Sequence, residues 1–165
     1  MPLPIAHGLV GASLVALIHP LAKIKNKKWK ALLWGFLLAN SPDLDFAFAF
    51  LFGWKNFHRG ISHSLFFALL IGALIFVFLQ RKNWQIPLAY ALAFLSHTLL
   101  DFIASSEGAV RLLTPFDNGK YALGWFGFSE LTRGLIISDM LRFSIIETLI
   151  FVPVFFIVLR AKKFS

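Results

Sequence analysis

Histidine and aspartate residues recur along this chain in a pattern that suits a divalent metal ion. His97 and Asp101 are four residues apart, so on a helix both side chains project from one face toward a shared point. Imidazole nitrogen and carboxylate oxygen are both common ligands of zinc and similar ions. Five more candidate ligands come from distant segments: His7, Asp43, Asp45, His58 and His63. The pattern therefore predicts a site for one or two divalent ions, with zinc as the first choice.

Two motifs could add catalytic groups to this site. Asp43 and Asp45 follow Pro42, which lacks an N–H group and can break a helix, so the freed turn could present both carboxylates. We expect one of the two to act as a general base or to bridge two ions. Arg59 lies in a motif that runs from His58 to His63. Its guanidinium suits a substrate phosphate or carboxylate, because it forms bidentate hydrogen bonds.

The composition predicts an all-α integral membrane protein rather than a soluble one. Of the 165 residues, 58% are apolar and only 15% are charged, against about 25% charged in ordinary soluble domains. Twenty Phe and five Trp fit a lipid environment, where large apolar side chains are enriched and Trp gathers at the interfaces. The absence of Cys excludes disulfides and thiolate metal ligands.

Five hydrophobic segments come close to the length that crosses a bilayer, about 20 residues with a range of about 17–25. They predict one membrane-embedded domain, residues 1–165, built as a bundle of about five transmembrane helices. The second segment is interrupted between Asn40 and Asp45. Residues 104–141 mix Gly, Pro, charges and short apolar runs, so we expect an outer loop there. The expected helices cover residues 4–22, 30–52, 64–80, 84–103 and 142–160.

The basic residues predict the orientation of the bundle, because Lys and Arg favour the cytoplasmic side of a membrane. Five spans bring three basic clusters to one side, at residues 23–30, 81–82 and 160–163. The N-terminus is then outside the cytoplasmic membrane and the C-terminus is cytoplasmic.

In a soluble protein the net charge of +8 would indicate nucleic-acid binding. Membrane topology explains it here, so we expect the lipid bilayer and no nucleic acid as partner, and the oligomeric state stays open.

Most of the His and acidic residues fall at the opposite, extracytoplasmic end of the expected helices. The seven candidate ligands come from four segments and reach a common depth, and Glu147 on the last helix falls near the same level. Ionisable groups in or beside hydrocarbon are costly and mark functional candidates, so Glu147 is an additional candidate ligand. His19, at the cytoplasmic end beside Pro20, is better explained by a hydrogen bond to a neighbouring helix.

Five pieces of the chain form one set: His7-Gly8, Ser41-Pro-Asp-Leu-Asp45, His58-Arg-Gly-Ile-Ser-His-Ser64, His97-x-x-x-Asp101 and Thr114-Pro-Phe116. This set resembles the YdjM-like family of membrane-bound metal-dependent hydrolases, which implies a divalent-metal hydrolase. The ligand order is also similar to that of zinc-dependent phospholipase C and related all-α nucleases. A later His-x-x-x-Glu pair of that family is incomplete here, since Phe143 stands four residues before Glu147. The difference favours one or two ions over three.

Three functions fit these observations. The leading hypothesis is hydrolysis of a phosphoester, such as a lipid phosphate, at the outer membrane–water boundary. There a bound metal would lower the pKa of its water to about 7, with Asp43 or Asp45 as base and Arg59 on the phosphate. A transporter for a metal ion or a proton is the second, since ionisable residues inside bundles also mark such pathways. The third is a structural protein whose metal only ties helices together, for which a closed four-ligand shell is typical.

Overall fold

The computed structural model describes residues 3–21, 27–53, 59–79, 83–104, 110–125 and 137–162. In these ranges the regular structure is helical, apart from an isolated antiparallel bridge between Val110 and Tyr121. The prediction of an all-α fold is therefore confirmed. The elements are α1 Pro4–Ile18, α2 Lys28–Asn40, η3 Ser41–Asp43, α3 Leu44–Phe52, η4 Ile61–His63, α4 Leu65–Leu79, α5 Gln85–Ala104 and α6 Ile137–Ala161, where η denotes a 3-10 turn.

The second predicted helix is broken at the position that the sequence indicates. α2 ends at Asn40, and the turn η3 follows with Pro42 near its start. Pro42 has no N–H to donate to the preceding turn, so a regular α-helix does not continue through it. α3 then begins at Leu44. The break places Asp43 in the 3-10 turn and Asp45 in the first turn of α3, where the two carboxylates can face different partners.

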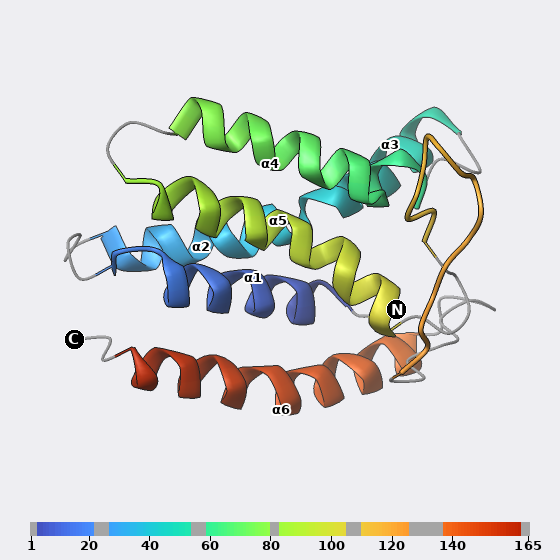
Figure 1. The fold of residues 1–165 in the computed structure, drawn as a ribbon. Coiled ribbons are helices and arrows are strands. Elements are labelled where there is room, and N and C mark those ends of the chain that lie inside the picture. Colours follow the sequence, from blue (N-terminus) through green and yellow to red (C-terminus); the bar gives the residue numbers. More distant parts are fainter. Residues whose placement is uncertain are drawn as a thin grey trace.

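The long helices lie side by side and alternate in direction (Figure 1). The starts of α1, α4 and α6 and the ends of α2 and α5 lie at one end of the bundle, on the right in Figure 1. The segment 110–125 lies at this same end. The start of α2, with its Lys residues, and the end of α6, with Arg160, lie at the other end. The connectivity thus separates a basic end from the end to which the candidate ligands belong.

α1 and α5 are the central helices, because α1 contacts α2, α5 and α6, and α5 contacts α1, α2 and α4. Glycines allow the backbone of α1 to approach that of α2 closely. A Cβ atom on Gly11 would lie 2.5 Å from the carbonyl oxygen of Gly35 and would overlap the methyl group of Ala39. Small residues at helix contacts are a common packing device in membrane bundles. This contact holds the end of α2, including Ala39, at a fixed position against α1.

Much of the bundle surface is apolar, which suits contact with lipid. α5 and the residues 144–161 of α6 are long and apolar enough to cross a membrane. Half of the α5 segment is buried inside the protein, but only 17% of the α6 segment is, so α6 presents most of its apolar surface outward. α1 and α4 are also apolar but have 15 residues each, fewer than the about 17 that a perpendicular span requires.

Candidate metal centre

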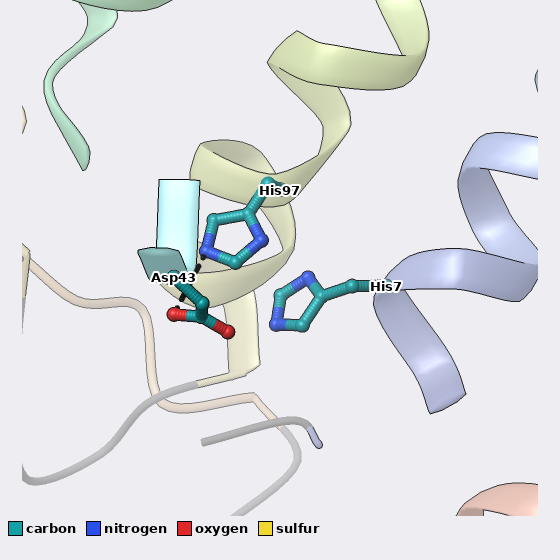
Figure 2. A group of neighbouring side chains, drawn as sticks. All are labelled: His7, Asp43 and His97. Carbon is teal, nitrogen blue, oxygen red and sulfur yellow. Dashed lines mark ion pairs between the residues drawn. The ribbon is translucent and has the colours of Figure 1, made fainter. Parts of the chain in front are cut away.

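Four elements that are distant in the sequence bring His and Asp side chains together at one end of the bundle. α1 contributes His7, η3 contributes Asp43, η4 contributes His63, and α5 contributes both His97 and Asp101. Figure 2 shows His7, Asp43 and His97 converging from three of these elements. Four of the five residues are fully buried, and the side chain of Asp43 is 19% exposed.

The closest approach in this group is between two imidazoles. His63 Nε2 and His97 Nε2 lie 3.0 Å apart, and the rings meet edge to face. Asp43 Oδ1 lies 3.3 Å from the first nitrogen and 3.5 Å from the second. Asp101 Oδ2 lies 3.6 Å and 3.7 Å from the same two nitrogens. Each of these two carboxylate oxygens therefore lies within 3.7 Å of both imidazole nitrogens.

Each of these two imidazoles is held from behind through its other nitrogen. His97 Nδ1 lies 2.7 Å from the carbonyl oxygen of Ala39, which can only accept, so Nδ1 carries the proton. His63 Nδ1 lies 3.3 Å from Asp45 Oδ2 and 3.1 Å from Ser62 Oγ. Both arrangements direct Nε2 inward, and such outer partners are typical of histidines that bind metal.

The distances fit a small metal ion. With metal–ligand bonds of about 2.0–2.2 Å, neighbouring ligands of a tetrahedral site lie about 3.3–3.6 Å apart. The five separations above span 3.0–3.7 Å. Both oxygens of the buried Asp101 also lack a hydrogen-bond partner among the described residues, so they are available to bind an ion or water. The residues present therefore could hold a divalent ion.

His7 is close to this group but faces it differently. Its ring stacks on that of His97, with centroids 4.0 Å apart and planes 24° from parallel. His7 Nε2 lies 3.4 Å from Asp101 Oδ1, which is within ion-pair range. Neither ring nitrogen makes a hydrogen bond of acceptable geometry to any residue that the structure describes. His7 is therefore a buried imidazole that faces the Asp101 carboxylate and makes no well-aligned hydrogen bond within the described residues.

Asp45 lies behind His63 rather than at the centre of the group. Its Oδ2 faces His63 Nδ1 and accepts hydrogen bonds from the Ser62 hydroxyl and, at 3.2 Å, from the backbone N–H of Arg59. Arg59 has a φ of 60°, which is uncommon for a residue with a side chain. Asp45 and Arg59 are thus brought next to the candidate centre, and their predicted catalytic roles stay predictions.

Two further candidate ligands are placed differently. His58 lies outside the described residues. Glu147 is buried in α6, where its Oε1 accepts a 2.7 Å hydrogen bond from the backbone N–H of Leu3 at the start of α1. Among the described residues it belongs to neither of the groups with metal-ligand spacing, His7–Asp43–His97 and His63–His97–Asp101. Its observed contact ties α6 to the helix that carries His7.

Sequence reasoning did not identify the Ala39 carbonyl or the Ser62 hydroxyl as outer partners. A backbone carbonyl has no signature in a sequence, so nothing in the chain could have singled out Ala39. Ser62 adjoins His63 within the motif, which gave a signal, but its contact with Asp45 depends on how α3 meets η4. His19 at the far end of α1 is buried and packs edge to face against Tyr90. Its Nδ1 has no hydrogen-bond partner among the described residues, so the expected hydrogen bond to a neighbouring helix stays a prediction.

The fold and this group define a helical membrane protein with a buried cluster of His and Asp side chains that could hold a metal ion. The model of the YdjM inner membrane protein family matches residues 1–163. The chain therefore belongs to the YdjM inner membrane protein family, and its place is the cytoplasmic membrane.

One curated relative matches part of the chain. Inner membrane protein YbcI of Escherichia coli (strain K12) is 33% identical over 99 residues, which cover 55% of this chain and 57% of that protein. The match thus spans little more than half of the relative's length. No solved structure matches the chain significantly. Both names, that of the family and that of the relative, give a membrane location and mention no activity.

Proposed function

We propose that this protein is a divalent-metal hydrolase that cleaves a phosphoester at the outer face of the cytoplasmic membrane. One observation carries the proposal. The Nε2 atoms of His63 and His97 lie 3.0 Å apart, and each ring is fixed from behind by a hydrogen-bonding partner. Such partners orient metal-binding imidazoles and increase their basicity. Polar groups are costly inside an apolar bundle, so the presence of two buried imidazoles with their outer partners supports a functional role.

Three buried groups would hold the ion: His63 Nε2, His97 Nε2 and Asp101 Oδ2. Catalytic zinc sites combine three protein ligands with one position left open for water or substrate. Asp43 lies on the open side, because it is the only partly exposed carboxylate in the described group. Zinc is our first candidate, since imidazole and carboxylate suit it, although manganese and iron accept the same groups.

A bound divalent ion supplies Lewis acidity, lowering the pKa of a water molecule to about 7 and polarising a phosphoryl oxygen. Asp43 is our candidate for the general base at the open position. Asp45 receives a positioning role, because it holds His63 through Nδ1. Arg59 is attached to the same carboxylate through its backbone N–H, and its guanidinium suits the phosphate of the substrate.

The substrate that we propose is a lipid phosphate, because the candidate centre lies at one end of an apolar bundle. We assign five spans, with α2 and α3 together forming the second. Basic residues gather at the opposite end of the bundle, at the start of α2 and the end of α6, and such residues favour the cytoplasm. This supports an external N-terminus, a cytoplasmic C-terminus and a centre that faces the extracytoplasmic side.

The test begins with the metal content of the detergent-purified protein, measured by mass spectrometry beside His97→Ala and Asp101→Ala. His19→Ala is the matched control, because it removes a buried histidine at the other end of α1. We expect near-stoichiometric metal in the wild type and the control, and its loss in both other variants. The metal-loaded protein should then release phosphate or a phosphorylated headgroup from a panel of lipid phosphates. Absence of metal after reconstitution would contradict the hydrolase, and inactivity on every lipid would contradict the substrate class.

A structural metal tie is the second candidate, because Asp43 Oδ1 lies close enough to both imidazoles to complete a closed four-ligand shell. Asp43→Asn separates the two functions. A catalytic base can be replaced by Asn with loss of activity and little loss of metal. A structural ligand cannot be replaced by Asn without loss of metal, since a closed shell depends on all four groups. Metal loss in Asp43→Asn, without any hydrolysis by the wild type, would favour the structural function.

A further inference from the structure

We propose that the candidate centre lies inside the hydrocarbon layer of the membrane, about 10 Å below its outer boundary, and that it takes the phosphate of a lipid drawn inward from the headgroup layer. This inference rests on the proposed function and extends it, because it states how the membrane presents the substrate and what limits access. The evidence is the length of the helices on either side of the centre.

Three helices measure the distance from the basic end of the bundle to the centre. On α5, His97 lies 12 residues after the first residue, Gln85. On α1, His7 lies 11 residues before the last residue, Ile18. α2 ends directly before the turn that contains Asp43 and has 13 residues. At a rise of about 1.5 Å per residue, the centre lies about 17–20 Å from the basic end. The hydrocarbon layer is about 30 Å thick, so helices that start at its inner boundary reach the centre about 10 Å before the outer one.

The basic end of the bundle carries residues that mark a membrane boundary. Lys30 near the start of α2 and Arg160 in the last turn of α6 are exposed. Trp29 and Trp84, beside the starts of α2 and α5, are 65% and 60% exposed, and Trp gathers at membrane interfaces. If the centre lay at the outer boundary, these four side chains would lie about 10 Å inside the hydrocarbon layer, where charge is costly. They therefore place this end of the bundle at the inner boundary.

Apolar surface continues outward beyond the centre. α5 runs seven residues past His97 to Ala104, about 10 Å, and α6 begins farther out than α1 (Figure 1). α3 lies toward the same end and exposes large apolar side chains that need contact with lipid tails, because soluble surfaces rarely expose so large an apolar patch. The hydrocarbon layer therefore extends past the level of the centre. These side chains of α3 are Leu44, Phe46, Phe48, Phe50, Leu51 and Phe52.

This depth makes access to the centre depend on the bilayer. Lipid phosphates lie in the headgroup layer, outside the hydrocarbon. Because the basic end of the bundle is fixed at the inner boundary, a thicker bilayer moves the outer headgroups farther from the centre. A bilayer can thin locally around short helices at modest cost, and α1 and α4 have only 15 residues each. A phosphoester without acyl chains has no anchor in this layer, so the inference favours lipid phosphates over water-soluble substrates.

The deciding test measures depth along α6 and needs neither metal nor activity. The chain has no Cys, so each single Cys variant accepts one spin label. Collisions with oxygen and with a water-soluble nickel chelate report its depth in phosphatidylcholine vesicles. We expect the deepest label at Leu149, because the midplane lies about 15 Å, or about ten residues, from Arg160. A deepest label at Ile157 would place the centre at the outer boundary and overturn the inference. The labelled positions are all more than half exposed: Leu141, Ile145, Leu149 and Ile157.

Val77→Cys on α4 is an independent check of the same depth. α4 packs against α5, whereas α6 packs against α1, so a local distortion of α6 by its labels does not decide the outcome. Val77 is 70% exposed and lies 12 residues after Leu65, the first residue of α4, which is about 18 Å toward the basic end. We expect its label near the inner boundary. A label near the midplane would contradict the proposed depth.

Bilayer thickness tests the consequence for the substrate. The protein is placed in vesicles of short-chain or long-chain monounsaturated phosphatidylcholine, each containing the lipid phosphate that the panel identifies, beginning with phosphatidic acid. We expect hydrolysis to be several-fold slower in the long-chain vesicles at equal metal content, and glycerol phosphate to resist hydrolysis in both. Equal rates in the two vesicles, or faster hydrolysis of glycerol phosphate, would refute the inference and leave the hydrolase intact. Inactivity on every lipid would contradict the proposed function instead, while the depths of the labels would still decide where the centre lies.

Discussion

His63 and His97 point their Nε2 atoms at each other across 3.0 Å, although they come from a 3-10 turn and a helix that are 34 residues apart. The arrangement depends on what stands behind each ring. A backbone carbonyl holds His97, whereas a carboxylate and a hydroxyl hold His63. The two imidazoles are thus oriented before any ligand binds, and the predictions below test how this orientation is maintained.

Asp45→Asn should weaken metal binding without removing any of the three ligands that we propose for the ion. The amide cannot provide the negative charge that faces His63 Nδ1 at 3.3 Å, and loss of such an outer partner typically costs about 10–100-fold in affinity. Titration of the apoprotein with metal, in competition with a chelating dye, measures the effect. Asp117→Asn, in the exposed segment 110–125, is the control. Unchanged affinity in Asp45→Asn would show that this carboxylate does not support the site.

Gly11→Ala should disturb the centre from a distance. The added methyl group would meet the Gly35 carbonyl and Ala39, pushing α2 away from α1 and moving the carbonyl that orients His97. Overpacking of this kind costs about 1–3 kcal/mol, and we expect weaker metal binding along with lower stability.

Gly72→Ala is the matched control, because its Cβ would meet Ala91 at an ordinary 3.4 Å. Replacing a helical glycine there should be neutral or stabilise the protein by up to about 1 kcal/mol. Thermal unfolding in detergent and metal titration distinguish the two variants. Equal behaviour of Gly11→Ala and Gly72→Ala would show that the close contact between α1 and α2 has no role in the site.

Removing the metal should destabilise the fold. A ligand that binds only the native state adds about 2.7 kcal/mol when its concentration is 100 times Kd. A strong chelator should therefore lower the unfolding temperature of the wild type and of His19→Ala, and added metal should restore it. His97→Ala should no longer respond to either treatment. An equal response in His97→Ala would mean that the stabilising ion binds elsewhere.

Metal binding should strengthen as the pH rises toward about 9. Burial by itself lowers the pKa of His63, but hydrogen bonds with Asp43 and Asp45 and the charge of Asp101 outweigh it and raise the pKa to about 9. His63 is therefore protonated at neutral pH in the metal-free protein, and an ion has to displace that proton. We expect affinity to increase about tenfold per pH unit below this pKa, and to level off above it.

The stability of the metal-free protein should change in the opposite direction. A histidine with a raised pKa contributes stability below its unfolded value of about 6.5, and this contribution disappears as the pH rises through about 9. Unfolding measured with and without chelator across this range checks both signs. In Asp45→Asn the pKa of His63 should fall, so the affinity should level off at a lower pH. Affinity independent of pH would contradict a ligand role for His63.

Two substitutions of Arg59 separate its backbone from its side chain. Its φ of 60° costs about 1 kcal/mol for a residue with a Cβ atom, and glycine avoids that cost. Arg59→Gly should therefore be more stable than Arg59→Gln. Both should raise KM for a phosphoester substrate and leave the metal content unchanged, because neither retains the guanidinium. Metal loss in both variants would indicate that Arg59 supports the ligands rather than the substrate.

Several features could be predicted from the sequence because they depend on local or compositional physics. The apolar composition indicates a membrane protein. Pro42 interrupts the second helix regardless of which helices pack against it. His97 and Asp101 share a helical face because their spacing of four matches the turn of an α-helix. Successive apolar segments cross the bundle in alternating directions. The sequence alone therefore predicts that the basic clusters lie at one end of the bundle and most His and Asp residues at the other. These conclusions require no knowledge of which helices touch.

Other features depend on the tertiary structure alone. Asp43 and Asp45 are two residues apart, yet one faces the imidazole pair and the other stands behind His63, because the 3-10 turn ends between them. The support of His97 by the Ala39 carbonyl requires α2 to pack against α5, while Gly11 allows α2 to approach α1 closely. The stacking of His7 on His97 likewise requires α1 to lie against α5. Sequence spacing determines which side chains can share a face, whereas helix packing decides which atoms meet.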